Sequence, residues 1–140
     1  QNTLLGARGA DNLIGGFAAD VLAGGPGVDT YTYLHWSDST FNFGTDTILG
    51  LQGGDVIDLS AIDATDDFDD STADTSDDAF VLVNRFSGTE ETPSAGGELT
   101  ISYIAAQDIS LIKGDLDGDG NADLLIQVNG DARDFDNFVL

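Results

Sequence analysis

Three aspartates recur at nine-residue intervals near the start of the chain, and each ends a glycine-rich stretch. Asp11, Asp20 and Asp29 hold the sixth place of three consecutive nonamers that together span residues 6–32. Glycine lets the backbone take positive φ and turn its carbonyl groups inward, and each carboxylate adds charge. Because Ca²⁺ takes about six to eight oxygen ligands from carboxylates and carbonyls, the pattern predicts calcium-binding loops.

The eighth place of each nonamer carries a large apolar residue: Leu13, Leu22 and Tyr31. A short strand that points this side chain into a core is expected after each loop. One loop and one strand make half a coil, so loops should stack on the same side every eighteen residues. A single loop offers too few oxygens for Ca²⁺, and we therefore expect loop 6–11 to share its ion with loop 24–29.

Two calcium sites follow from this spacing. One pairs Asp11 with Asp29, and the other pairs Asp20 with Asp38, which stands nine residues after Asp29 in a segment that lacks the glycines. Asp46 is a further candidate near the end of the coil stack. Backbone carbonyls of the loops are the other expected ligands, and we assign them to Arg8, Gly9, Phe17, Ala18, Gly25 and Gly27.

The nonamer frame also extends backwards, because Asn2 and Leu4 occupy the aspartate and apolar places of an earlier repeat. We therefore expect the chain to be part of a longer protein. Two alanines depart from the glycine pattern, Ala7 at the second place and Ala18 at the fourth. If these places need a left-handed backbone, each alanine costs roughly 1–2 kcal/mol, and the site containing Ala18 is weakened. A glycine-rich linker, the alternative interpretation, would need neither residue in fixed phase.

The chain of 140 residues is strongly acidic, with 26 acidic and 4 basic residues and a formal net charge of −22. Of the acidic residues 23 are Asp and 3 are Glu, which fits short carboxylates in turns and metal loops. This charge argues against nucleic acid as a partner, because phosphate binding needs a basic face. Without cysteine the chain forms no disulfide or zinc thiolate site, and no apolar run predicts stable membrane insertion.

The remaining sequence predicts short strands separated by turns. The aromatic segment 33–45 is expected to cap the open end of the coil stack. Segment 46–60 predicts a strand, a Gly-Gly turn, a second strand and a helix start capped by Ser60. The Asp-rich segment 64–79 predicts an exposed loop. Its carboxylates either form a further cation site or are simply solvated. Later strands are expected at 80–84, 98–104, 109–113, 122–128 and 135–140, and they indicate an antiparallel sandwich packed on the end of the parallel coil.

A second acidic motif is Asp115-Leu-Asp-Gly-Asp-Gly-Asn-Ala-Asp123. Asp115, Asp117 and Asp119 at alternate positions, with Asp123 at the ninth, resemble the start of an EF-hand loop. The twelfth position is Ile126 rather than Glu, and strands flank the motif, so it is not a true EF-hand. Two interpretations remain: a hairpin stabilised by calcium on these four aspartates, and a plain Asp/Gly turn.

Together these motifs resemble the C-terminal RTX domain of serralysin-type secreted metalloproteases, which other type I secretion substrates share. The resemblance rests on the following segments: the three nonamers, Gly27-Val-Asp-Thr-Tyr-Thr-Tyr33, Asp38-Ser39, 46–60 and Gly118-Asp-Gly-Asn-Ala-Asp-Leu-Leu-Ile126. It implies an all-β fold, with a calcium-binding parallel β-roll over residues 1–45 and an antiparallel β-sandwich over 46–140. It also implies that the C-terminus, Asp136-Asn-Phe-Val-Leu140, is an export signal; a final core strand is the plain alternative.

The predicted function is a calcium-dependent folding, stabilising and type I secretion module at the C-terminus of a secreted bacterial enzyme. Its expected partners are an upstream catalytic domain of the same chain and the type I secretion machinery. The zinc motif H-E-x-x-H of the proteases is absent and His35 is the only histidine. The parent enzyme could therefore be a metalloprotease, a lipase or an epimerase, and this segment itself is not expected to be catalytic.

Two other functions would also use residues of this sequence. A calcium-stabilised module that binds polysaccharide or a cell surface would use the aromatic residues of segment 31–43, with Trp36 as the residue to test. An enzyme could use Asp55 and Asp58 as a glycosidase-like carboxylate pair. The enzyme is the weaker hypothesis, because both aspartates lie in a strand-and-turn pattern that already accounts for them.

Overall fold

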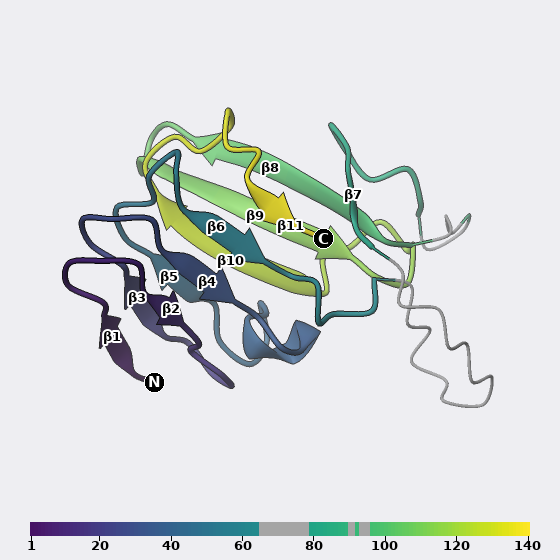
Figure 1. The fold of residues 1–140 in the computed structure, drawn as a ribbon. Helices are drawn as coiled ribbons and strands as arrows, with labels where there is room; N and C mark the ends of the chain where they lie inside the picture. Colours follow the sequence, from purple (N-terminus) through teal and green to yellow (C-terminus); the bar gives the residue numbers. More distant parts are fainter. Residues whose placement is uncertain (65–78, 90–91, 93–95) are drawn as a thin grey trace.

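The computed structural model describes residues 1–64, 79–89, 92 and 96–140, and it consists of two facing β-sheets (Figure 1). Its strands are β1 (Thr3–Leu5), β2 (Asn12–Leu13), β3 (Val21–Ala23), β4 (Thr30–Thr32), β5 (Asp46–Ile48), β6 (Val56–Asp58), β7 (Val81–Leu82), β8 (Glu98–Ile104), β9 (Ile109–Asp115), β10 (Leu124–Asn129) and β11 (Phe138–Val139). A single-turn 3₁₀ helix, η1 (Trp36–Asp38), lies between β4 and β5. Within the described ranges there is no α-helix.

Strands β1 to β6 alternate between the two sheets, which is the arrangement of a β-roll. The odd-numbered strands β1, β3 and β5 are parallel neighbours in one sheet, and the even-numbered strands β2, β4 and β6 are parallel neighbours in the other. Thr3 pairs with Val21, and Asn12 pairs with Thr30. The predicted eighteen-residue coil is therefore confirmed for the glycine-rich repeats.

The next coil is longer. Val21 pairs with Thr47 and Thr30 pairs with Val56, so the spacing is 26 residues. The additional residues lie between β4 and β5 and include η1. The expected end cap over 33–45 is therefore wrong: residues 33–40 are an excursion between two coils, and Phe41 and Phe43 after it have exposed side chains.

Two further repeats follow the excursion, and they carry few of the glycines. They span 41–49 and 50–58, with Asp46 and Asp55 at the sixth place. Gly44 stands at the fourth place with φ 129°, close to the 126° of its counterpart Gly9. The roll thus extends beyond residue 45, where the sequence pattern predicted that it would end.

The eighth-place side chains form two buried rows in the core, one from each of the facing sheets. They are Leu13, Leu22, Tyr31, Ile48 and Ile57. Alternate residues of a strand point to opposite faces of a sheet, so one inward position in each short strand is enough to build each row. Fully burying a side chain of this kind contributes roughly 1.5–3 kcal/mol. The core continues into the later strands through Ile112, Ile126 and Val128.

The antiparallel strands are joined edge to edge with the roll. β10 pairs with β5 in parallel and with β9 in antiparallel orientation, and β8 follows β9. One sheet therefore runs β1-β3-β5-β10-β9-β8-β7 along the molecule, while the facing sheet has the order β11-β6-β4-β2 (Figure 1). The all-β class and the parallel β-roll are confirmed, and the antiparallel strands follow the roll. They join the last coil of the roll, where β10 extends one sheet next to β5 and β11 extends the other next to β6.

Two local predictions are wrong. No helix begins at Ser60, because Ser60 lies in a turn whose backbone N–H and hydroxyl donate to Oδ1 of Asp58, at 3.1 and 2.7 Å. The buried strand expected at 80–84 is reduced to β7 at the sheet edge, where Phe80 is buried but Val81 is exposed. The further cation site considered for 64–79 falls almost entirely outside the described residues.

Candidate metal sites

The aspartates of the roll are stacked in two columns, one on each side. The first column contains Asp11, Asp29 and Asp55, and the second contains Asp20 and Asp46. Within a column, the backbone N–H of one aspartate donates to Oδ1 of the next. The N···O distances are 2.9 Å for Asp11 to Asp29, 3.0 Å for Asp29 to Asp55 and 2.8 Å for Asp20 to Asp46. Each column therefore begins a regular ladder of carboxylates.

The second carboxylate oxygen of most column members is buried without a hydrogen-bond partner. This holds for Oδ2 of Asp11, Asp20, Asp29 and Asp46. A buried charged oxygen without a partner is strongly unfavourable, so four in one small structure require an explanation. The lower end of the first column differs, because Oδ2 of Asp55 accepts a hydrogen bond from the Gln52 backbone at 2.8 Å.

The unpartnered oxygens lie over the first glycine of a nonamer. A Cβ added at Gly15 would lie 3.0 Å from Oδ2 of both Asp20 and Asp46. A Cβ added at Gly6 would lie 2.7 Å from both Oδ2 of Asp11 and the carbonyl oxygen of Gly24. Several oxygen atoms that receive no hydrogen bond match the ligands that Ca²⁺ prefers. The oxygen atoms of both columns are therefore suitable ligands for this ion.

Neighbouring loops of the first column touch through their backbones. The N–H of Gly9 donates to the carbonyl of Pro26 at 3.1 Å. A Cβ added at Gly27 would overlap the carbonyl oxygen of Gly9, and one added at Gly25 would overlap that of Ala7. Only glycine fits at these two places, and the loops are close enough to share an ion.

The two alanines that replace glycine do adopt the left-handed backbone. Ala7 and Ala18 both have φ 81°, while Gly16 and Gly25, which share the nonamer place of Ala7, have φ 73° and 99°. The conditional prediction of strain is therefore met. At roughly 1–2 kcal/mol for each residue, the strain is large for a small domain, and both strained residues lie in the loops.

Asp38 does not stand next to Asp20 in the ladder, contrary to the prediction. Its Oδ2 accepts hydrogen bonds from the backbone N–H groups of Leu34 and His35, at 3.0 and 3.1 Å, and so closes the turn of η1. Asp46 takes the expected place because the excursion shifts the register. The frame of nine predicts Asp38 only if no residues are inserted.

Burial shapes the electrostatics of the second column. It raises the pKa of the Asp46 carboxyl to about 7, which a hydrogen bond from the backbone of Asp20 partly offsets, and the charges of Asp20 and Asp38 raise it further. The Tyr33 hydroxyl is buried nearby without a partner, and burial raises its pKa well above the usual value. A bound cation would remove the repulsion between these groups.

The residues predicted to supply carbonyl ligands all lie in the stacked loops, but their contacts differ. Gly9 faces Gly27 across the two loops of the first column, and Ala18 lies against Gly44 in the second. The carbonyl of Gly25 accepts a hydrogen bond from the Gln52 side chain at 2.6 Å. The carbonyls that the sequence assigned at Arg8 and Phe17 stand at the third place of their nonamers, and their role stays a prediction.

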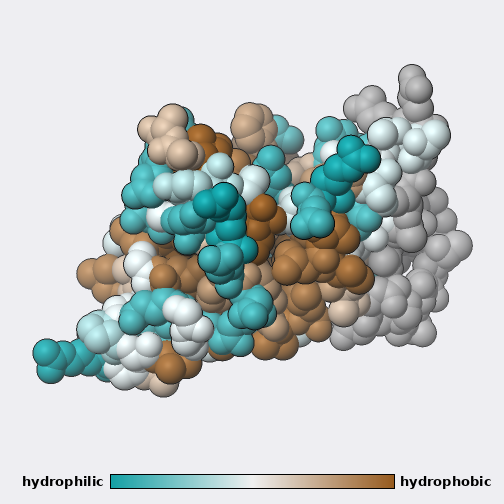
Figure 2. Space-filling model, turned by 90° about the horizontal axis from the view of Figure 1, so that it is seen from above, coloured by the Kyte–Doolittle hydropathy of each residue, from teal (hydrophilic) through white to brown (hydrophobic). Residues whose placement is uncertain are grey.

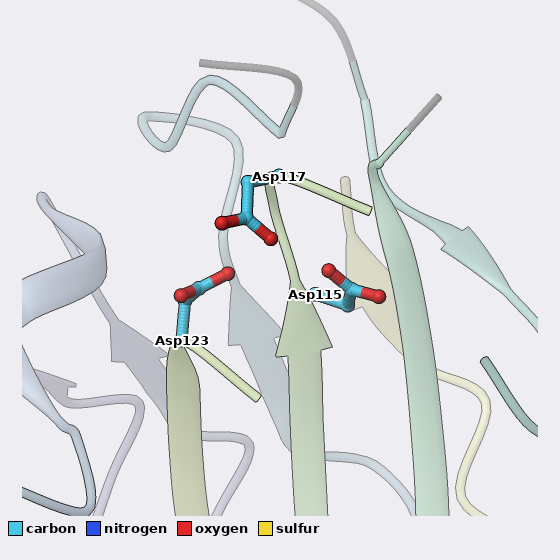
Figure 3. A group of neighbouring side chains, drawn as sticks. All are labelled: Asp115, Asp117 and Asp123. Atoms are coloured by element: carbon cyan, nitrogen blue, oxygen red, sulfur yellow. The ribbon is translucent and has the colours of Figure 1, made fainter. Parts of the chain in front are cut away.

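The second acidic motif forms the turn between β9 and β10. Oxygen atoms of Asp115, Asp117 and Asp123 all lie within 4.8 Å of one another (Figure 3), and we call these residues the hairpin cluster. Asp115 is fully buried and accepts hydrogen bonds from the N–H groups of Gly118 and Gly120, at 2.8 and 2.9 Å. The structure thus brings together three of the four predicted aspartates.

The fourth, Asp119, is turned away, since its carboxylate accepts hydrogen bonds from the backbone and side chain of Asn121 at 2.6 and 2.9 Å. Within the hairpin cluster, Oδ2 of Asp123 accepts from the Leu116 backbone at 2.8 Å. Burial raises the pKa values of Asp115 and Asp123, while their backbone hydrogen bonds lower them. Because the turn supplies its own donors, the cluster is partly satisfied without an ion.

Sequence reasoning underestimated the residues after the excursion. The sequence pattern makes Asp46 a further candidate only, and it assigns Asp55 to a strand and a turn. A signal for both exists in hindsight: Gly44-Thr-Asp46-Thr-Ile48 and Gly53-Gly-Asp55-Val-Ile57 keep the fourth, sixth and eighth places of the nonamer. The repeat 41–49 lacks glycine at the first and second places, and the repeat 50–58 keeps only Gly50 of the two, so the glycine pattern does not reveal them.

A parallel β-roll with stacked aspartates in glycine-rich loops defines the class of calcium-binding RTX modules found in secreted proteins. The family model for the serralysin C-terminal region of M10 peptidases matches residues 2–140, and the chain belongs to this family. Such regions stand at the C-terminus of larger proteins and are not the catalytic part.

A solved structure with a similar fold is the AlgE6R3 subunit of the mannuronan C5-epimerase from Azotobacter vinelandii. The TM-score is 0.59 at 22% sequence identity, and the match covers 99% of this chain and 77% of that chain. At this identity the likeness concerns the fold alone. The search of curated proteins finds no match. Among the described residues, no helix is long and apolar enough to cross a membrane.

Proposed function

We propose that this chain is a module that folds on calcium, stabilises the secreted protein to which it belongs, and carries its type I export signal. The observation that supports this most strongly is the set of four buried carboxylate oxygens without partners in the two columns. A fold that places them there without a cation would be self-repelling. With a cation, the same groups hold neighbouring coils together.

The proposed ligands follow from the geometry. In the first column they are the carboxylates of Asp11 and Asp29, with loop carbonyls between them. In the second column they are the carboxylates of Asp20 and Asp46, where Asp46 takes the role that the sequence gave to Asp38. Asp115, Asp117 and Asp123 are proposed as a separate site in the hairpin cluster.

Calcium binding to such sites becomes folding free energy, because residues from different coils meet only in the folded chain. At a net charge of −22, the chain without calcium is loosened by its own repulsion. Where Ca²⁺ is scarce, inside the cell, the chain would stay unfolded and exportable. Millimolar Ca²⁺ outside would fold it, next to the catalytic domain proposed to precede it.

The C-terminal strand supports this order of events. Phe138 of β11 pairs with Ile57 of β6, and the ring of Phe138 packs edge-on against Phe135 at 5.1 Å between centroids. The tail proposed as the export signal is thus part of a sheet once the chain is folded. Recognition by the secretion machinery would therefore precede folding.

The test is circular dichroism during a calcium titration. Strand content should be low in EDTA and rise cooperatively as calcium reaches the millimolar range, while magnesium, which needs a more regular octahedron of ligands, should do much less. Equal strand content in EDTA and in calcium would refute the proposal. For export, a variant lacking residues 136–140 should remain inside a bacterium that carries a type I system, although it still contains all the roll aspartates.

A further inference from the structure

Two adjacent hollows on the surface are lined by exposed aromatic rings. The larger, about 410 Å³, lies between Phe17, Ala18, Ser37 and Phe43. The smaller, about 200 Å³, shares Phe43 and is lined by Trp36, Thr40, Phe41, Asn42, Ala122 and Asp123. We call the two together the aromatic groove. It lies where the excursion between β4 and β5 meets the loop of the second column.

The rings of the groove are unusually open to solvent. Phe17, Phe41 and Phe43 are 73%, 80% and 70% exposed. Figure 2 shows the molecule from above Figure 1, and on that face too hydrophobic residues reach the surface in patches among hydrophilic ones. Single exposed apolar residues are ordinary, but a contiguous group of large ones marks an interaction site.

The roll itself does not need these rings. Phe17 and Phe43 both hold the third place of their nonamers, on successive coils of the second column. The corresponding residues of the first column are Arg8, Pro26 and Gln52. The third place is therefore free to vary, and aromatic residues occupy it only on the side where the excursion completes a groove.

Charge restricts the occupant. All four basic residues of the chain, Arg8, Arg85, Lys113 and Arg133, lie in the described part, and none of them lines either hollow. Asp123 lines the smaller one. The net charge of −22 stays strongly negative with several ions bound, since each Ca²⁺ adds only two positive charges. A second copy of this chain, an acidic glycan and an anionic membrane are all repelled.

The lining of the larger hollow disfavours a sugar. Apart from Ser37, its side chains are hydrocarbon, so the hydroxyl groups of a buried sugar would lose water without gaining partners. A bulky apolar side chain has no such loss. The smaller hollow presents the rings of Trp36, Phe41 and Phe43, which suit a Lys or Arg side chain through cation–π contact, and the negative net charge of the chain attracts the same side chain.

We propose that the aromatic groove binds a cationic peptide segment of a partner protein, with a bulky apolar residue beside Lys or Arg. The apolar side chain lies between Phe17 and Phe43. The basic side chain lies over the rings of Trp36 and Phe41. This surface goes beyond calcium binding and export, and it requires only that the chain be folded.

The experiment measures fluorescence anisotropy of a labelled peptide of alternating Leu and Arg, with the protein folded in millimolar calcium. Two matched peptides replace either all Leu by Ser or all Arg by Glu, and each is expected to bind at least about tenfold more weakly, which is about 1.4 kcal/mol. Raising the salt concentration should weaken the Leu-Arg peptide, since the charges are partly screened.

The matched variants are Phe17→Ser and Phe43→Ser against Val81→Ser, an equally exposed apolar residue on β7 at the other end of the sheet. The first two should each weaken binding about tenfold or more, the third should leave it unchanged, and all three should keep the circular dichroism spectrum. Equal affinity of the three variants for the Leu-Arg peptide would overturn the proposal. So would binding that depends on Phe43 for a neutral oligosaccharide or zwitterionic vesicles but not for the peptide.

Discussion

The roll columns and the hairpin cluster both gather aspartates, but by opposite routes. In the columns, the residues that meet are 18 or 26 apart in sequence, and every Oδ2 atom except that of Asp55 is buried without a partner. In the hairpin cluster, three aspartates come from nine consecutive residues, and backbone N–H groups of the same turn bind Asp115 and Asp123. Calcium is therefore expected to be a condition of folding for the roll and only a local addition for the hairpin.

The two regions also differ in the free energy that is needed to bring their carboxylates together. Placing carboxylates from separate coils side by side requires a folded chain, so their repulsion opposes folding itself. Placing them within one turn requires only local backbone conformations that Asp and Gly readily adopt. The two regions should thus respond differently to the same loss of charge, and four predictions follow in order of expected size.

The largest effect is expected from Asp29→Asn, which removes one charge from the middle of the first column. Calcium affinity measured by isothermal titration should fall about a hundredfold, about 3 kcal/mol, and the calcium midpoint of folding should rise with it. Asp117→Asn in the hairpin cluster should leave that folding midpoint nearly unchanged. Asp134→Asn, an exposed aspartate outside both regions, controls for net charge. A larger shift for Asp117→Asn than for Asp29→Asn would reverse the comparison.

A smaller loss is expected from Gly15→Ala, whose added methyl group would lie 3.0 Å from Oδ2 of both Asp20 and Asp46. Spreading these two oxygens should destabilise the calcium-bound protein by about 1–3 kcal/mol, measured by urea unfolding. Gly53→Ala is the matched control, since a Cβ there meets nothing within 4 Å. Equal effects of the two substitutions would show that the second column holds no ion at this point.

The pH dependence of stability should differ between the calcium-free and the calcium-bound roll. The folded-state pKa of Asp46 is raised to about 7, above its value in an unfolded chain. The folded state is therefore favoured at low pH, and this contribution is lost as pH rises through about 7. In calcium-free protein that retains structure, stability should fall by about 1 kcal/mol between about pH 6 and about pH 8.

Calcium should reverse this trend, because binding needs the ionised carboxylate, so affinity should rise over the same interval. Thermal unfolding at several pH values, with and without calcium, measures both slopes. Asp46→Asn should flatten them. A calcium-free protein whose stability rises from about pH 6 to about pH 8 would contradict the assignment of Asp46.

The smallest effects are expected from Ala18→Gly and Ala7→Gly, which relieve a left-handed backbone at φ 81°. Each should stabilise the calcium-bound protein by about 1 kcal/mol, since the relieved strain of roughly 1–2 kcal/mol is partly offset by the greater freedom of glycine in the unfolded chain. Thermal unfolding in calcium measures the gain. Ala10→Gly, in the same loop and without positive φ, should give no stabilisation.

Periodicity alone determined the regular part of the molecule. The eighth-place residues Leu13, Leu22 and Tyr31 are buried, coils repeat every eighteen residues, and Ala7 and Ala18 are left-handed wherever glycine was expected. These features depend on interactions between successive repeats of one frame. The sequence determines their spacing, because each repeat contacts equivalent neighbouring repeats in the same geometry.

Only the tertiary structure decided what happens where the frame is interrupted. The excursion after β4 places Asp46 in the second column and leaves Asp38 to bind the backbone of Leu34 and His35. Phe41 and Phe43, directly after the excursion, are exposed, and β10 joins β5 to extend the roll into the antiparallel strands. The roll tolerates an inserted segment of any length, provided that the strand after it can still pair with the roll. Hydrogen bonding between distant strands, rather than local spacing, therefore selects which carboxylate completes each site.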